Sequence, residues 1–271
     1  MSVRAISVNL WGQRVCAIAV DANGQLNTQF DPQFLKANLD IAPINLPIED
    51  LRQNPTQIQR FDDLPERTYR GLPAFLVDSL PDDFGNALVN QYMASKGILP
   101  RDITVLDRLA YTGKRAMGAF EFEPASKDIV KNKAALEMSN LIEMARRALT
   151  GNLEDAPEQS LQDLLSVGTS AGGARAKAVI AWNPKTNEVF GGQFDAPPGS
   201  EHWLLKFDGV GVDTELGLSE GYGKVEYAYY LMAKAAGIDM TESKLFEENG
   251  RSHFMTKRFD REGNQKIFYQ S

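Results

Sequence analysis

The sequence is poor in the residue types that build disulfides and metal centres. It has one cysteine, Cys16, and two histidines, His202 and His253, among 271 residues. A single cysteine cannot form an internal disulfide, and this usage fits a reducing compartment. Neither histidine has cysteines or carboxylates at ligand spacing. We therefore expect no metal site, and we assign both histidines to structural or surface roles.

Long apolar runs are also absent. No uninterrupted apolar stretch approaches the roughly 18 residues of a membrane span, and the first residues lack the apolar core of a signal peptide. The net charge of −7 disfavours broad, nonspecific binding to nucleic acid or to an acidic membrane. We expect a soluble, cytoplasmic protein that has no contact with membranes.

The first part of the chain predicts a small mixed α/β domain over residues 1–125. Gly12-Gln13 and Asn23-Gly24 are typical of hairpin turns between strands. Prolines and charges dominate residues 42–73, which predicts loop and an edge strand. Asp82 and Asp83 follow a proline at the start of an apolar-periodic segment, and this position favours helix capping over a catalytic pair of acids.

The second part, residues 126–271, contains the residues that indicate a function. A helix is predicted over 128–150, and a glycine-rich loop follows at 168–177, with strand-like segments expected on both sides. Lys206 ends an apolar, strand-like run, and Glu226 opens an amphipathic helix 20 positions later. Protein kinases present their phosphate-binding lysine and its helix glutamate in this order. Loop amides would approach phosphate oxygens, and the glutamate would hold the lysine beside the same anion.

Two more strands are predicted over 243–246 and 253–257, and Arg258 to Arg261 would form the hinge. The order of these elements matches the small lobe of a protein kinase. The predicted fold class is therefore α+β, with a small mixed domain followed by a kinase-like small lobe made of an antiparallel sheet and a helix.

These segments resemble the HipA family of serine/threonine kinase toxins. The resemblance is carried by the loop at 169–177, the strand at 203–207, the helix start at 225–227 and the hinge at 257–261, and residues 71–82 resemble that family's N-terminal domain. It covers essentially the whole chain. It implies a toxin of a type II toxin–antitoxin system, linked to persistence, which phosphorylates a translation factor such as an aminoacyl-tRNA synthetase.

The resemblance also assigns roles to individual residues. It makes Ser170 the autophosphorylated serine of the loop, Lys206 the ATP-binding lysine and Glu226 its partner. The other residues that it places at the ATP site are Ala171, Gly172, Gly173, Arg258, Phe259 and Asp260. ATP and Mg²⁺ are the implied ligands. The family's catalytic and Mg²⁺-binding aspartates have no counterpart after Arg261, so we expect no catalytic residue here and a truncated form that lacks the helical large lobe.

The implied partners are a helix-turn-helix antitoxin similar to HipB, the protein substrate, and operator DNA reached through the antitoxin. Two other functions stay open at this point. The chain could be a noncatalytic module that binds nucleotide or antitoxin. It could also be a serine hydrolase, because Gly168 to Gly172 satisfies G-x-S-x-G around Ser170. That motif needs a strand before it and a helix after it, whereas residues 178–182 read as a strand.

Overall fold

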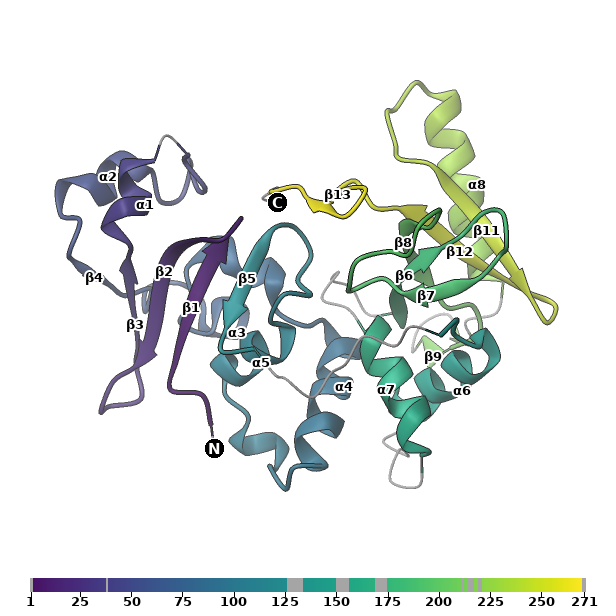
Figure 1. The fold of residues 1–271 in the computed structure, drawn as a ribbon, viewed down its shortest axis with the longest axis horizontal. Helices are drawn as coiled ribbons and strands as arrows, with labels where there is room; N and C mark the ends of the chain where they lie inside the picture. The colour runs from purple at the N-terminus through teal and green to yellow at the C-terminus, as the bar shows by residue number, and fades with distance from the viewer. Residues whose placement is uncertain are drawn as a thin grey trace.

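Two five-stranded antiparallel sheets, with helices between and beside them, form the fold in a computed structural model (Figure 1). The structure describes residues 2–37, 39–125, 134–149, 156–168, 175–210, 212–213, 217–218 and 221–269. The strands of the first sheet come from residues 5–123 and those of the second from residues 177–257, and the α+β class is confirmed.

The first sheet has the strand order β4-β3-β2-β1-β5. Its strands are β1 (Ala5–Leu10), β2 (Gln13–Val20), β3 (Leu26–Phe30), β4 (Ile58–Gln59) and β5 (Phe120–Glu123). Both predicted hairpins are present. Trp11 and Gly12 turn between β1 and β2 with φ of 50° and 81°, and Gly24 in the next turn has φ of 84°. Positive φ at both central residues suits the right-handed twist of a two-residue hairpin.

The helices of the first part are α1 (Pro32–Lys36), α2 (Ile48–Gln53), α3 (Glu66–Tyr69), η1 (Ala74–Ser79), α4 (Asp83–Ala94), η2 (Pro100–Asp102) and α5 (Val105–Thr112). Asp82 caps α4 by accepting the N–H of Gly85, so the capping interpretation is confirmed. The expected loop at 42–73 also holds α2 and α3, which each begin directly after a proline. The sequence pattern does not predict α5, although Thr104 and Asp107 form a capping box at its start.

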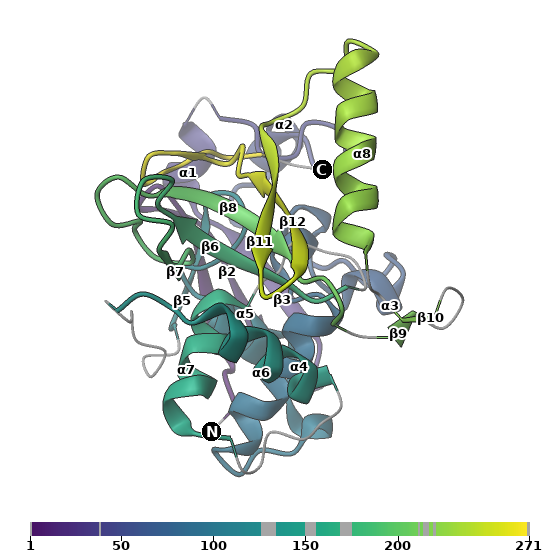
Figure 2. The same cartoon turned by 90° about the vertical axis from the view of Figure 1, so that its right-hand side faces the viewer.

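The second sheet has the order β11-β12-β8-β6-β7. Its strands are β6 (Lys177–Trp182), β7 (Val189–Gly191), β8 (Glu201–Lys206), β11 (Ser243–Glu248) and β12 (Arg251–Lys257). Helix α8 (Tyr222–Ala235) runs alongside β11 and β12 (Figure 2). Two small two-stranded sheets also lie in this part: β9 (Val212–Asp213) pairs with β10 (Gly217–Leu218), and β13 (Arg261–Glu262) forms a hairpin with β14 (Gln265–Lys266).

Helices α6 (Met138–Leu149) and α7 (Glu158–Val167) precede the second sheet. The prediction of a strand before the glycine-rich loop is wrong, because α7 continues to Val167. Leu161, Leu164 and Leu165 have helical spacing and face the core, and this pattern outweighs the β preference of one valine. The predicted helix at 128–150 begins only at Met138; residues 128–133 and 150 lie outside the described residues.

Two hydrophobic cores result from this arrangement. One lies under the first sheet and includes Ile6, Val8 and Phe122. The other joins the second sheet to α6 and α7, and α4 contributes Phe84 and Leu88 to it. Helix α4 therefore belongs to the second core, although it lies in the first part of the sequence.

The C-terminal hairpin β13–β14 runs back to the first sheet. The Trp11 indole N–H donates to the carbonyl of Lys266 at 2.9 Å. Phe268 packs edge-on against Phe120 of β5 and lies against the first core. Residues from both ends of the sequence thus complete the same core.

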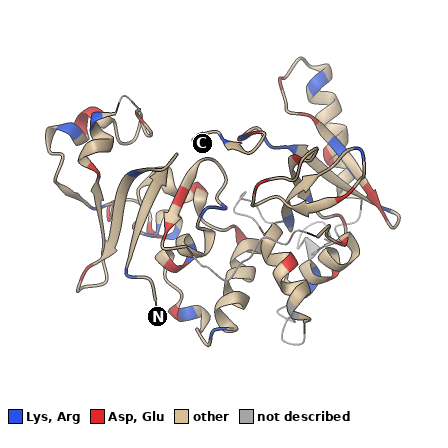
Figure 3. Cartoon of the chain, in the orientation of Figure 1, with Lys and Arg blue, Asp and Glu red and all other residues tan. Residues whose placement is uncertain are grey.

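Charged residues of both signs are spread along both parts of the chain (Figure 3). Among the described residues, no helix is both long enough and apolar enough to cross a membrane.

Candidate functional site

Lys206 and Glu226 form an ion pair at the end of the central strand of the second sheet. Lys206 ends β8, Glu226 lies in the second turn of α8, and the distance from Lys206 Nζ to Glu226 Oε2 is 2.5 Å. Both side chains are partly exposed, with exposed fractions of 34% and 24%. The structure thus brings together the two residues that the sequence pattern singled out, and solvent can reach both.

The backbone around the pair explains this position. Strand β8 lies between β6 and β12, where Lys206 is paired with Lys177 on one side and Phe254 on the other. Helix α8 approaches β12 closely at Gly223, where an added Cβ would lie 1.9 Å from the carbonyl oxygen of Ser252. Any other residue there would push the helix outward. Gly223 therefore allows the close packing that places Glu226 over the end of β8.

Arg175 joins this pair, and sequence reasoning missed it. Its Nη1 lies 3.6 Å from Glu226 Oε1, whereas Lys206 contacts the other carboxylate oxygen, Oε2. Its guanidinium also lies 3.9 Å from the centroid of the Tyr222 ring in the first turn of α8. The residue was visible at the exit of the glycine-rich loop, but nothing in the local sequence linked it to α8.

The glycine-rich loop itself cannot be placed against the pair. Ser170, Ala171, Gly172 and Gly173 lie outside the described residues, so their roles stay predictions. The described chain resumes at Arg175, next to β6.

Lys177, the first residue of β6, is anchored to the first part of the chain. Its Nζ lies 2.7 Å from Asp82 Oδ2, and the two side chains are only 3% and 2% exposed. Asp82 also accepts the Gly85 N–H at 2.7 Å. One carboxylate therefore caps α4 and fixes the strand that follows the loop.

The predicted hinge is a buried junction between the two parts of the chain. Arg258 and Asp260 form a two-pronged ion pair, with Nε–Oδ1 at 2.8 Å and Nη2–Oδ2 at 2.6 Å. Arg261 also donates to Asp260 Oδ2, at 2.8 Å. The Gly118 N–H, next to β5, donates to the same oxygen at 2.7 Å. Burial raises the pKa of Asp260, but hydrogen bonds and charge from Arg258, with Arg261 and Gly118, bring it below the usual 3.8.

These contacts limit how the hinge could meet a nucleotide. The side chains of Arg258 and Asp260 are 1% and 0% exposed and are directed at each other, so any nucleotide contact there would involve main-chain groups or Phe259. Phe259 is exposed and lies edge-on to Tyr269. Arg258 directly follows β12 and lies four residues after Phe254, the partner of Lys206. At the rise of an extended chain, the two residues are roughly 13 Å apart along the backbone.

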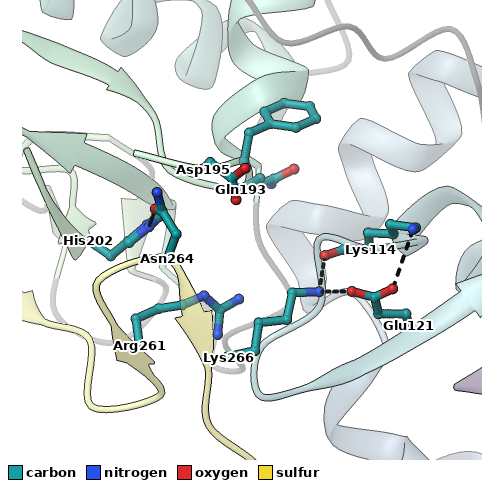
Figure 4. A pocket seen from close by; sticks show the side chains of 9 residues that line it. Lys114, Glu121, Gln193, Asp195, His202, Arg261, Asn264 and Lys266 are labelled. Atoms are coloured by element: carbon teal, nitrogen blue, oxygen red, sulfur yellow. Dashed lines mark hydrogen bonds and ion pairs between the residues drawn. The ribbon is translucent and has the colours of Figure 1, made fainter. Parts of the chain in front are cut away.

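A cavity of about 260 Å³ lies beside this junction (Figure 4), and most of the residues that line it are polar or charged. It is lined by Lys114, Glu121, Gln193, Phe194, Asp195, His202, Arg261, Asn264 and Lys266. Lys266 Nζ donates to Glu121 Oε1 at 2.9 Å, which joins β14 to β5 across the cavity. The cationic side chains that line the cavity, Lys114, Arg261 and Lys266, thus form ion pairs or hydrogen bonds with oxygen atoms of the protein.

Both histidines are buried, which rules out a surface role. His202 Nδ1 lies 3.1 Å from the Gly192 carbonyl and Nε2 lies 3.1 Å from Asn264 Oδ1, and burial lowers its pKa. His253 accepts the Asp208 N–H at its Nδ1, and burial lowers its pKa to about 4. Within the described part of the chain, no group of three or more His, Cys, Asp or Glu side chains could hold a metal ion.

Comparison with known proteins agrees with this architecture. Residues 6–123 match the family profile of the HipA N-terminal domain, and residues 169–271 match that of the HipA-like C-terminal domain. The chain belongs to the HipA family. No protein of curated function matches this HipA-family sequence significantly.

Among solved structures, this HipA-family chain is similar to HipA from the Shewanella oneidensis MR-1 toxin–antitoxin system, solved with HipB and its operator DNA. The TM-score is 0.55 and the sequence identity is 15%. The alignment covers 97% of this chain and 53% of the Shewanella chain. The present chain thus spans about half the length of that relative, and the likeness between the two shows a shared fold.

Proposed function

We propose that this HipA-family chain binds ATP, as the nucleotide-binding half of a serine/threonine protein kinase toxin. The Lys206–Glu226 ion pair carries the proposal, because it joins a central strand to the adjacent helix in the order that kinases use to hold nucleotide phosphates. The lysine would contact the phosphates as a fixed charge. The glutamate would limit its rotamers, since a free lysine loses much side-chain entropy when it is held in one place.

The partners follow from the same family. The Shewanella relative was solved with HipB and operator DNA. By analogy, a helix-turn-helix antitoxin similar to HipB would bind this chain and connect it to operator DNA, and an aminoacyl-tRNA synthetase or another translation factor would be the substrate. Purification of the chain together with an antitoxin encoded beside it tests the first of these points.

Loss of the lysine should weaken ATP binding. In Lys206→Ala we expect the Kd for Mg·ATP to rise about 10- to 100-fold, because one hydrogen bond to a charged group contributes about 1.5–3 kcal/mol. Glu226→Ala should add little in the Lys206→Ala background, since the two residues act as a unit. The two effects are measured by isothermal titration calorimetry of wild type, the two single variants and the double variant, which together form a double-mutant cycle.

Lys244→Ala is the matched control for this cycle. Lys244 also pairs with a glutamate, Glu242, at 2.9 Å, but it lies on β11 and is 40% exposed. Its loss should leave the Kd unchanged. Fully additive effects of the Lys206 and Glu226 substitutions, or equal affinity of wild type and Lys206→Ala, would contradict the proposed site.

Phosphoryl transfer is not expected from the polypeptide 1–271 by itself. Kinases need one aspartate to orient the substrate hydroxyl and another to bind Mg²⁺, and neither motif follows Arg261. Intact-mass spectrometry after incubation with Mg·ATP should therefore show no added phosphate, on Ser170 or elsewhere. A phosphorylated Ser170 under these conditions would mean that the chain is a complete kinase.

A noncatalytic nucleotide- or antitoxin-binding module is the second candidate. It shares the binding predictions above and differs only in having no phosphoryl transfer in any complex. A serine hydrolase is disfavoured by the fold. The segment that ends at Gly168 is helix α7 and the segment that begins at Lys177 is strand β6, which is the reverse of the strand-to-helix order of a nucleophile elbow.

A further inference from the structure

The guanidinium of Arg175 is held in place by contacts that leave its hydrogen-bond donors unused. Tyr222 supports one face of the group at 3.9 Å. Glu226 Oε1 lies 3.6 Å from Nη1, which is beyond hydrogen-bonding distance. Arg175 donates no hydrogen bond to any residue that the structure describes. An arginine carries five N–H donors, so this one is oriented and still able to bind an acceptor.

The charges around Arg175 favour an anionic acceptor. Lys206 and Arg175 share the single carboxylate of Glu226, so the three side chains carry a formal charge of +1. All three are partly exposed; the exposed fraction of Arg175 is 31%. Helix α8 adds to this field, because its N-cap, Gly221, has no capping side chain and the helix start carries a partial positive charge. The cluster therefore presents excess positive charge to solvent.

We propose that Arg175 binds a phosphate group of the nucleotide beside Lys206, and that Glu226 positions both cations. The inference rests on the proposed function, since it assigns a further residue to the same site. A planar guanidinium can donate two parallel hydrogen bonds to a phosphate, whereas lysine acts as a point charge. Tyr222 fixes the plane of the guanidinium, so less side-chain entropy is lost on binding.

The alternative role for Arg175 is purely structural. A partly exposed ion pair with Glu226 would contribute little to stability, and its loss would leave phosphate affinity unchanged. The two roles therefore differ in a measurable way, because only a phosphate ligand changes the affinity for compounds that contain phosphate.

The test is calorimetric titration of the full chain with three ligands: Mg·ATP, inorganic pyrophosphate and adenosine. In Arg175→Gln the Kd for ATP and for pyrophosphate should rise about tenfold or more, and that for adenosine should stay the same. Arg175→Lys keeps the positive charge but cannot donate two parallel hydrogen bonds to one phosphate. Its affinity for ATP and pyrophosphate should therefore lie between those of Arg175→Gln and wild type. Thermal melting of each variant verifies that it is folded.

Arg101→Gln is the matched control, because it removes the same charge from an 81% exposed arginine in η2. It should bind all three ligands as wild type does. Equal ATP affinity of wild type and Arg175→Gln would overturn the role of Arg175 and leave the proposed function intact. A wild type that fails to bind ATP would overturn the proposed function. In that case the titrations with pyrophosphate decide whether Arg175 is a phosphate ligand. The role is supported if wild type binds pyrophosphate and Arg175→Gln does not, and it is overturned if wild type does not bind pyrophosphate.

Discussion

Asp260→Asn is expected to lower the free energy of unfolding by about 3–5 kcal/mol, since removal of one partner from a buried ion pair leaves an uncompensated charge. Asp260 is fully buried, and its two carboxylate oxygens accept hydrogen bonds from Arg258, Arg261 and the Gly118 N–H. The neutral amide would leave the Arg258 guanidinium, which is 1% exposed, without a counter-charge. Urea denaturation followed by circular dichroism measures the change.

The same acid-to-amide change at Glu201 is the control. Glu201 pairs with Lys257 at 2.6 Å, but both side chains are well exposed, at 37% and 40%. Exposed pairs contribute at most about 1 kcal/mol, so Glu201→Gln should have a small effect. Similar losses in the two variants would show that burial of the Asp260 junction has no special energetic role.

The Asp260 junction also predicts a pH dependence. The pKa of Asp260 in the folded chain is lower than the ordinary 3.8. A carboxyl group with a lowered folded-state pKa stabilises the fold above its unfolded-state pKa and loses that effect as the pH falls through the folded-state value. The stability difference between wild type and Asp260→Asn should therefore be full at neutral pH and shrink below about pH 4. A difference that stays constant down to pH 2 would contradict this assignment.

Asp82→Asn should also cost about 3–5 kcal/mol, because it breaks the buried pair with Lys177. The amide oxygen can still accept the Gly85 N–H, so the helix cap is partly kept. The cost would thus come mainly from the charge pair that joins α4 to β6. Denaturant unfolding with two probes, tryptophan fluorescence and circular dichroism, would measure the loss.

Asp83→Asn provides a neighbouring control. Asp83 is exposed in the first turn of α4, where a negative charge contributes about 0.3–1 kcal/mol through the helix dipole. A loss at Asp83 as large as that at Asp82 would mean that the charge near the helix start, and not the pair with Lys177, stabilises this junction.

Local sequence was enough to predict the elements that carry the Lys206–Glu226 pair. Lys206 ends a strand with a clear apolar pattern, and Glu226 follows in a helix bounded by glycines. The turn at Asn249-Gly250 between β11 and β12 is likewise local, since both residues have positive φ. Features that depend on a few neighbouring residues were therefore predictable.

The junctions between the two parts of the chain were not predictable. Lys177 and Asp82 are 95 positions apart, and Asp260 and Gly118 are 142 positions apart. No periodic pattern links such residues, and their pairing depends on how two cores pack together. The sequence predicts a strand in place of helix α7 for a different reason. A short apolar segment that ends in valine is compatible with a strand or with a helix. The helical spacing of its leucines distinguishes the two only once it is known which side chains face the core.

The return of the C-terminal hairpin to the first sheet has a consequence for synthesis on the ribosome. The Trp11 indole donates a hydrogen bond to the carbonyl of Lys266, which is translated 255 residues later. Phe268, near the same hairpin, packs against Phe120 of the first sheet. Domains generally begin to fold as they emerge, N-terminal residues first. The first sheet would therefore leave the ribosome with part of its apolar surface uncovered until the last residues of the hairpin are made.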